Sequence, residues 1–414
     1  MEIGVHDVLL GEERVGTLTP VPGGGCSFAY RPELADRREA GALPLSAALP
    51  LRAEPFGPEQ SSAYLAGLLP EGRARQRLAR LVGADPADEH RLIGAAGEDC
   101  VGAIVFAPRD RETAGAGRVS NDAVLLGEEE LERLVVGSPG EPGLAVRHSL
   151  PGARHKLALA RDDGGGWRLP SATLPSTHVV KPGAGDLPGL LRNQLFCIEL
   201  GRRVGIPVAE AGIEVVGGRE CLVSRRFDRD GPARVHKEDI CQALGLPPPG
   251  ESRPGSEAPS PGLGEVSELL RASAGEEDVA RLLAVALFAY VIGNGDAHGA
   301  GFGLLHDSGG TRLAPLLDLR STVVYDLPIH VGMVIAEDFD QPVHLLELGC
   351  VCEECGFDFD RMRGIAGNLA ARVRDALGPL AERARAEGWH APVIDDIVGL
   401  AAERATGLGY EVAG

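Results

Sequence analysis

Apolar and polar residues alternate in short segments near the start of the chain and follow helical spacing further on. Residues 3–30 contain apolar segments separated by turn residues, including three glycines at 23–25, which is typical of antiparallel hairpins. Apolar residues recur at helical spacing in 61–69, 73–81 and 128–136. The first third of the chain is therefore expected to combine a small sheet with short helices.

A second group of strands is expected after a Gly-rich, charged linker at 108–122, from about residue 144 onward. The apolar segments 156–160 and 167–169 flank an Asp- and Gly-rich turn at 162–166, which is a strong hairpin signal. The other elements predicted here are a strand at 177–181, a helix at 193–203 that stops near Gly205, and strands at 211–216 and 220–225.

The last part of the chain is expected to be mainly helical. Residues 276–292 are acidic at the start and then almost wholly apolar, which predicts a deeply buried helix. The segments 302–306 and 312–317 are separated by a Gly-containing turn and predict a hairpin, and 341–406 predict helices. Residues 247–264 are rich in Pro and Gly and are expected to form a mobile loop.

Length and charge narrow the possible functions. A chain of 414 residues is expected to form two or three packed units. Its net charge of −19 argues against direct binding to nucleic acid, because phosphate neutralisation drives such binding. The sequence has no apolar run long enough for a membrane span and no signal-peptide pattern at its start, so a cytoplasmic protein without membrane contact is expected.

Most of the eight cysteines lie among apolar neighbours, as buried free thiols do in a reducing compartment. Cys350, Cys352 and Cys355 form a Cys-x-Cys-x-x-Cys pattern, with His344 nearby as a possible fourth ligand. A zinc site usually has four ligands at tighter spacing. Cysteines on one helix face are therefore favoured over a metal site.

Two aspartates are the main candidates for chemistry. Asp296 lies in a Gly-containing loop directly after the predicted buried helix, and Asp318 ends a strand 22 residues later. In phosphoryl transfer one Asp orients the attacking hydroxyl and another holds magnesium against the ATP phosphates. On spacing alone this signal is weak, and structural turn aspartates are the favoured reading.

A lysine and a loop could complete a phosphate site. Lys181 closes an apolar strand and suits a lysine that neutralises phosphates, although an edge-strand lysine in solvent looks the same. The segment 149–153 could be a loop whose amides approach phosphates, or an ordinary turn. Neither a Walker-type nor a dinucleotide-binding glycine motif occurs in the sequence.

The order of these parts is that of a protein kinase, and several segments are specific enough to suggest a family. The segments at 149–159, 176–182, 226–229, 236–245, 292–298 and 313–322 resemble HipA-like serine/threonine toxin kinases. Residues 14–18, 44–46 and 68–72 are similar to the first subdomain of that family. The resemblance extends from residue 3 to about 325, and more loosely to the end.

This resemblance implies an α+β fold: a two-lobed kinase-like structure with an extra β-rich N-terminal subdomain and a helical C-terminal lobe. The expected divisions are an N-terminal subdomain at 1–110, a linker at 111–143, a kinase N-lobe-like part at 144–232 and a helical C-lobe at 233–414. The implied cofactors are ATP and Mg²⁺. The implied partners are a small helix-turn-helix antitoxin, through which DNA is contacted indirectly, and a protein substrate of the translation machinery.

The resemblance also assigns roles to residues. Asp296 is expected to be the catalytic aspartate, Lys181 the phosphate lysine, Asp318 a magnesium ligand and Ser149 an autophosphorylated serine whose modification inactivates the enzyme. The expected nucleotide contacts are Gly152, Ala153, Lys156, Lys181, Arg226, Phe227 and His298.

The chain departs from the family pattern at positions that matter for activity. Ala300 and Gly301 stand where the family usually has Lys and the Asn that binds a second magnesium ion. Gln194 replaces the helix Glu expected to pair with Lys181, and Arg225 replaces a hinge Glu.

Three alternatives to an active kinase therefore stay open. The chain could be a pseudokinase that still binds nucleotide, or a non-catalytic regulator that binds an antitoxin. It could also be a metal-dependent hydrolase that uses Asp296, His298 and Asp318.

Overall fold

The computed structural model describes residues 4–35, 43–109, 124–137, 149–183, 185–249, 260–327, 333, 335 and 341–413. The chain forms two compact units, each assembled from several segments. The first unit comprises Met1–Pro182, Glu214–Ala258 and Leu305–Asp307, and the second comprises Gly183–Ile213, Pro259–Leu304 and Ser308–Gly414. Most of the Pro/Gly-rich segment 247–264, most of the predicted linker and the segment 138–148 lie outside the described residues.

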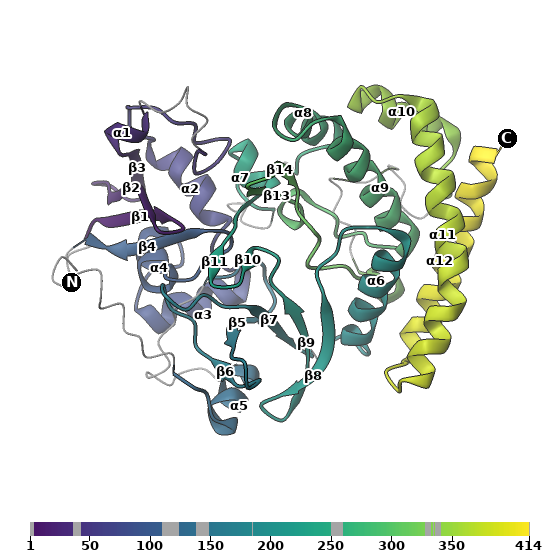
Figure 1. Cartoon of the computed structure of the whole chain (residues 1–414), viewed down its shortest axis with the longest axis horizontal. Coiled ribbons are helices and arrows are strands. Elements are labelled where there is room, and N and C mark those ends of the chain that lie inside the picture. The colour runs from purple at the N-terminus through teal and green to yellow at the C-terminus, as the bar shows by residue number, and fades with distance from the viewer. Residues whose placement is uncertain are drawn as a thin grey trace. The chain divides into compact units, whose positions relative to one another are not determined.

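The first unit begins with a four-stranded antiparallel sheet, which confirms the hairpins expected near the start of the chain (Figure 1). The strand order is β3(Cys26–Tyr30), β2(Glu13–Pro20), β1(His6–Leu10), β4(Ile104–Pro108). The accompanying helices are α1(Pro32–Ala35), α2(Pro58–Ala66), α3(Gly72–Val82) and α4(Glu89–Ala96). Helices α2 and α3 confirm the predictions from spacing, whereas β4 and α4 were not predicted.

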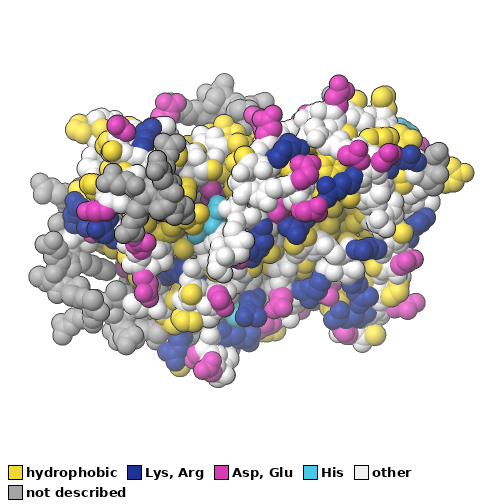
Figure 2. Space-filling model, turned by 45° about the horizontal axis from the view of Figure 1, so that its top comes forward, with side chains coloured by type: hydrophobic (Ala, Val, Ile, Leu, Met, Phe, Trp, Pro, Cys, Tyr) yellow, Lys and Arg dark blue, Asp and Glu magenta, His cyan; other side chains and the backbone are white. Residues whose placement is uncertain are grey.

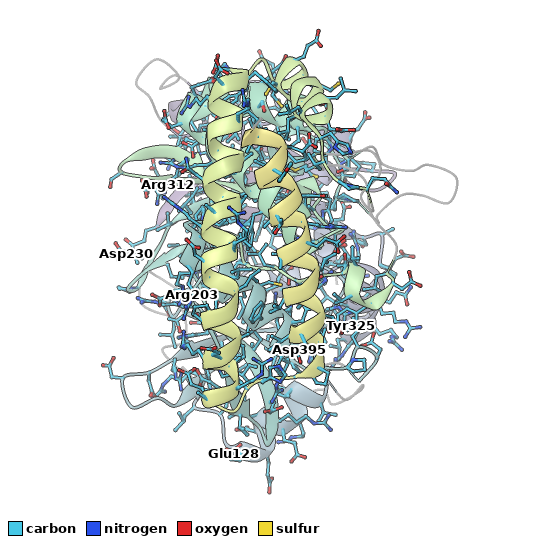
Figure 3. The ribbon with its side chains drawn as sticks, turned by 90° about the vertical axis from the view of Figure 1, so that its right-hand side faces the viewer. Glu128, Arg203, Asp230, Arg312, Tyr325 and Asp395 are labelled. Atoms are coloured by element: carbon cyan, nitrogen blue, oxygen red, sulfur yellow. The ribbon has the colours of Figure 1, made fainter. Side chains whose placement is uncertain are left out.

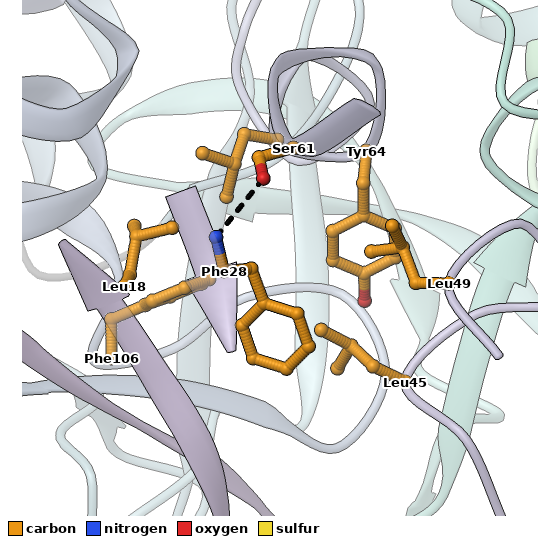
Figure 4. A pocket seen from close by; sticks show the side chains of 8 residues that line it. Leu18, Phe28, Leu45, Leu49, Ser61, Tyr64 and Phe106 are labelled. Carbon is orange, nitrogen blue, oxygen red and sulfur yellow. Dashed lines mark hydrogen bonds between the residues drawn. The ribbon is translucent and has the colours of Figure 1, made fainter. Parts of the chain in front are cut away.

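The core of this subdomain contains a small apolar gap lined by Phe28, Tyr64 and neighbouring side chains (Figure 4). Its volume of about 10 Å³ is close to the least that one water molecule needs. The backbone N–H of Phe28 donates to the Ser61 hydroxyl at 3.2 Å beside it. The gap is a packing defect of the core and is too small for a ligand.

The first unit also contains a five-stranded sheet. Its order is β6(Trp167–Arg168), β5(Leu157–Arg161), β7(His178–Pro182), β9(Arg219–Arg225), β8(Ala211–Val216). Helix α5(Glu128–Val136) packs on this sheet through Leu131 and Val135, which share a buried cluster with Val180 of β7. The predicted hairpin, the strands and the short helix at 128–136 are confirmed.

Short elements complete the first unit: β10(Arg229–Asp230), β11(Ala233–Arg234), β12(His236–Asp239) and α7(Ile240–Leu244). The Ser46 hydroxyl donates to the Glu238 carboxylate at 2.5 Å, and the Ala47 N–H donates to the other oxygen of Glu238 at 3.1 Å. The side-chain amide of Gln242 donates to the Tyr64 carbonyl at 2.8 Å. The family-specific segment 236–245 is therefore buried and holds the N-terminal subdomain to β12 and α7.

The second unit is mainly helical, as predicted for 276–292 and 341–406. Its helices are α6(Leu190–Val204), α8(Leu263–Ser273), α9(Glu276–Ile292), α10(Leu345–Cys355), α11(Phe359–Ala386) and α12(Pro392–Ala413). Helix α9 is buried along almost its whole length, and α11 and α12 run side by side (Figure 3). The strands of the predicted hairpin are β13(Gly303–Asp307), whose last three residues belong to the first unit, and β14(Gly310–Leu313). Because β14 ends at Leu313, Asp318 lies in an irregular segment and does not end a strand as predicted.

All eight cysteines are free, and all except Cys350 are buried. Burial raises the pKa of the Cys197 thiol to about 12, so this thiol is protonated at neutral pH. Cys350, Cys352 and Cys355 all lie on helix α10, but they do not share one face, because Cys350 is exposed and the other two are buried. None of the described helices combines the length and apolar character needed to cross a membrane.

Candidate active site

Asp296 and Asp318 lie close together in the second unit, because one guanidinium group contacts both carboxylates. The Arg320 Nη2 atom donates to Oδ2 of Asp296, and Nη1 of Arg320 lies 3.5 Å from Oδ2 of Asp318. The two carboxylates are partly exposed, whereas the Arg320 side chain is only 16% exposed. The site thus has two acidic groups and one cation in direct contact.

The Asp296 loop begins at a glycine that the backbone requires. Helix α9 ends at Gly293, which has a φ of 72°, and a Cβ atom there would lie 2.6 Å from a methyl group of Leu400. The Gly293 carbonyl accepts the N–H groups of Thr322 at 2.8 Å and Val323 at 3.1 Å. The Gly295 N–H donates to the Thr322 hydroxyl at 2.8 Å. These bonds hold the Asp296 loop against the segment that follows Asp318.

A buried asparagine fixes the Asp318 segment from its other side. The amide oxygen of Asn193 accepts the Ser321 N–H at 2.8 Å, and its amide nitrogen donates to the Ser321 carbonyl at 2.9 Å. Asn193 lies on helix α6 and is fully buried. Because both backbone groups of one residue are held by one side chain, Ser321 and its neighbour Arg320 have a defined position.

Gln194, the next residue on α6, contacts the candidate magnesium ligand directly. Its amide nitrogen donates to Oδ1 of Asp318 at 2.6 Å, and its side chain is buried. Sequence reasoning identified Gln194 only as a lost partner of Lys181. Its contact with Asp318 joins residues 124 positions apart, which no local sequence pattern indicates.

His298 and Gly301 lie on the C-terminal side of Asp296. The Nε2 atom of His298 is 3.8 Å from Oδ1 of Asp296. Gly301 ends a short 3₁₀ helix (Gly299–Gly301), is exposed, and has no atom within 4 Å of the position where a Cβ would lie. Gly301 supplies no side-chain ligand at the position where the family usually has Asn.

Oxygen ligands of the kind that magnesium prefers are present at this site. Magnesium is usually held by one or two carboxylates, with substrate phosphates and waters as its other ligands. Asp318 is the more exposed of the two carboxylates and fits this role. Within the described residues, no three His, Cys, Asp or Glu side chains gather as a protein-only metal site would require.

The first unit holds the candidate phosphate-binding residues. Lys181 lies on β7, and Lys156 immediately precedes β5. Leu157 pairs with Val180 in the antiparallel register, so the next positions on the two strands are Lys156 and Lys181. The Lys156 ammonium donates to the Pro151 carbonyl of the preceding loop. Two cations thus occur at one end of this strand pair.

The loop at 149–153 packs against the N-terminal subdomain within the first unit. Gly152 has a φ of 103°, a conformation that favours glycine, and its carbonyl accepts the Glu71 N–H at 3.2 Å. Ala153 is exposed at the tip of the loop. The Ser149 hydroxyl donates to the Leu68 carbonyl at 2.6 Å, and the Ser149 side chain is buried.

Arg226 lies in a buried ion-pair cluster of the first unit. Its guanidinium donates to Asp228 at 2.6 and 2.9 Å and to the Ser176 hydroxyl at 2.8 Å, and it lies 3.6 Å from Asp99. Burial alone would raise the pKa of Asp228, but the nearby arginines outweigh it and hold that pKa well below its usual range. Because the Arg226 side chain makes these buried contacts, we expect the predicted contact of Arg226 with a nucleotide to involve its backbone. Phe227 beside it is half-buried.

Comparison with known proteins identifies two matching family models. The description "HipA N-terminal domain" matches residues 6–107, and "HipA-like C-terminal domain" matches residues 148–377. A protein of Sinorhizobium fredii named "Putative kinase Y4mE" is 37% identical over 81% of this chain and 82% of its own length. The "Serine/threonine-protein kinase toxin HipA" of Shewanella oneidensis is 28% identical over 83% of this chain and 82% of its own length.

The fold agrees with these matches. A solved structure of Shewanella oneidensis HipA, in a complex with HipB and its operator DNA, has a TM-score of 0.77 at 24% identity and covers 98% of this chain and 96% of that one. The predicted α+β fold of the HipA type is therefore confirmed. On the extent of the family models and the identity to its relatives, this chain belongs to the HipA family.

Proposed function

We propose that this chain is an ATP- and magnesium-dependent serine/threonine protein kinase that acts as the toxin of a toxin–antitoxin pair. The observation that carries the proposal is the direct linkage of Asp296 and Asp318 through Arg320, in a chain of the HipA family. Phosphoryl transfer uses one carboxylate to orient the attacking hydroxyl and one to hold the metal. Asp296 and Asp318 are close enough for Arg320 to contact both.

Asp296 orients the substrate hydroxyl and accepts its proton, and Asp318 holds magnesium. Bound magnesium neutralises charge that develops on the phosphates. Lys156 and Lys181 are proposed to contact the phosphates, together with backbone groups of the loop at Gly152 and Ala153. His298, close to Asp296, is proposed as a further contact of the nucleotide or of Asp296.

Ser149 is proposed as the autophosphorylation site. The hydroxyl is buried and bonded to the Leu68 carbonyl, so it cannot accept a phosphoryl group in the conformation described. A phosphate carries about two negative charges at neutral pH and cannot remain in such a buried position unpaired. Phosphorylation of Ser149 would therefore require the loop to leave its position and would keep it displaced, which inactivates the enzyme.

The proposed partner is a small basic helix-turn-helix antitoxin, and the proposed substrate is a protein of the translation machinery. The similar HipA of Shewanella oneidensis was solved with HipB and operator DNA. This chain has a net charge of −19, and acidic and basic side chains are interspersed on the face drawn in Figure 2. Such a surface favours contact with DNA through a basic partner rather than directly.

The kinase proposal is tested by transfer of labelled phosphate from ATP to protein, with magnesium or manganese present. The wild-type chain should incorporate label into itself or into an added translation extract. The Asp296→Asn variant should lose incorporation by a factor of at least about a hundred, while Asp375→Asn, on the exposed face of α11, should keep it. No transfer by the folded wild type above the Asp296→Asn level would refute the proposal.

A nucleotide-binding pseudokinase is the second candidate, because Gly301 supplies no side-chain metal ligand. It predicts stabilisation by ATP without phosphate transfer. It also predicts that antitoxin binding survives Asp318→Ala. Measuring the melting temperature with ATP beside the transfer assay separates the two candidates.

A further inference from the structure

Arg320 is the one described side chain in contact with both candidate carboxylates to which the proposed roles assign no function. Its guanidinium contacts Asp296 through one terminal nitrogen and Asp318 through the other. Its Nε atom is buried and has no hydrogen-bond partner in the described part of the chain. Among the described residues, the recorded contacts of the guanidinium are thus with the two carboxylates.

The position of Arg320 is set by the backbone and not by chance contact of a long side chain. The next residue, Ser321, is held at both its N–H and its carbonyl by the buried Asn193 amide. Thr322 is bonded to the Asp296 loop through its N–H and its hydroxyl. The two residues that follow Arg320 are thus anchored, one to helix α6 and the other to the Asp296 loop.

The charges of the site differ from those of a two-metal kinase. Protein kinases hold two magnesium ions, one through an aspartate and the second through the catalytic-loop asparagine. Here Gly301 provides no ligand, and open space surrounds the position of its missing Cβ. The carboxylates of Asp296 and Asp318 carry two negative charges, and Arg320 already neutralises one of them.

We propose that Arg320 is a built-in cation that takes the place of one of the two metal ions, so that the chain holds a single divalent cation at Asp318. Arg320 acts as a positioning residue: it fixes the Asp296 carboxylate and supplies a positive charge without a second metal ligand. This inference rests on the proposed kinase function. Its test does not require activity, because the number of bound metal ions and their affinity can be measured directly.

The test is a titration of the full-length chain with Mn²⁺, followed by electron paramagnetic resonance of the free ion. Without nucleotide, Arg320→Gln should bind Mn²⁺ at least about tenfold more tightly than the wild type. The reason is that the guanidinium, which pairs with both carboxylates, is removed. Arg320→Lys keeps the charge and should stay near the wild-type affinity. Arg385→Gln, which removes a surface pair with Asp395, is the control and should change nothing.

A second arm counts ions in the presence of a non-hydrolysable ATP analogue. The wild type should bind one Mn²⁺ per chain, and Gly301→Asn alone should also bind one because Arg320 is still present. The double variant Gly301→Asn, Arg320→Gln should bind two.

The inference is overturned by two ions in the wild type, by unchanged or weaker Mn²⁺ binding in folded Arg320→Gln, or by tighter binding in Arg320→Lys. If the metal results hold and the wild type transfers no phosphate, the kinase proposal fails and the role of Arg320 stands. If the wild type transfers phosphate and the metal results fail, the role proposed for Arg320 fails and the kinase proposal stands.

Discussion

Gln194 places a neutral amide beside Asp318, at a position where the family usually has a carboxylate. Its amide donates to Asp318 at 2.6 Å in a buried position. Gln194→Glu, which restores the residue expected from the family, would place two carboxylates in contact and remove a donor. We predict a loss of about 1–3 kcal/mol in the free energy of unfolding, measured by urea denaturation, and partial recovery on adding Mn²⁺.

The control for this variant is Gln60→Glu, because Gln60 is exposed and contacts Arg52. That change should alter the free energy of unfolding by less than about 0.5 kcal/mol. A Gln194→Glu chain as stable as the wild type in the absence of metal would contradict the contact with Asp318.

His236 gives a prediction on pH dependence. Burial lowers the pKa of His236 to about 4, below its ordinary value of 6.5, although Glu238 opposes the shift. Between these values the unfolded chain binds a proton that the folded chain does not, so stability is fully present above pH 6.5 and falls as the pH falls toward 4. The loss from this residue is about 3 kcal/mol across that window.

The measurement is the free energy of unfolding at pH 7 and at pH 5 for the wild type and for His236→Gln. The variant should lose less stability on acidification than the wild type does. His344→Gln, at an exposed position, should follow the wild type. Equal pH slopes for His236→Gln and the wild type would show that folding does not lower the pKa of His236.

At the scale of residues, the sequence allowed Asp296 and Asp318 to be proposed as site residues, but not the side chains that contact them. Asp296 was recognisable from its glycine-containing loop, and Asp318 from the apolar segment before it, although strand β14 ends earlier, at Leu313. Arg320 and Gln194 were not recognised as site residues, because their role depends on contacts between positions far apart in the chain. The sequence signal that could have pointed to Arg320 is its position, two residues after Asp318.

At the scale of elements, the end of helix α9 is the critical junction. Gly293→Ala would force a side chain into a left-handed conformation and against Leu400. We predict a loss of about 1–3 kcal/mol in the free energy of unfolding. Gly364→Ala lies on helix α11 with open space around the new methyl group and should stabilise the chain by up to about 1 kcal/mol. Chemical denaturation of both variants checks this contrast, and similar effects of the two changes would contradict it.

The elements with strong local signals were predicted well. Helix α9 has the predicted bounds, because its apolar run lies between an acidic start and a glycine. Strand β4, helix α4 and the short elements β10 to α7 were not predicted. Their residues are fixed by buried contacts with distant segments, such as Ser46 with Glu238, and not by a repeating pattern.

At the scale of the whole molecule, the combined motifs predicted the family, whereas no motif predicted which segments of the chain pack together in one unit. The expected divisions at 1–110, 111–143, 144–232 and 233–414 follow the chain in one direction. The first unit takes segments from three parts of the sequence, including Glu214–Ala258 and Leu305–Asp307. Local composition does not reveal such an exchange of segments, because it depends on long-range packing.

The central claim is that Asp296 and Asp318 act together in one phosphoryl-transfer site. The most direct measurement is the single-turnover rate of phosphate transfer for the wild type, Asp296→Asn, Asp318→Asn and the double variant. Residues that act as a unit have strongly non-additive effects, so each single variant should lose at least about a hundredfold and the double variant little more. Wild-type rates in either single variant, or losses that simply multiply in the double variant, would contradict the claim.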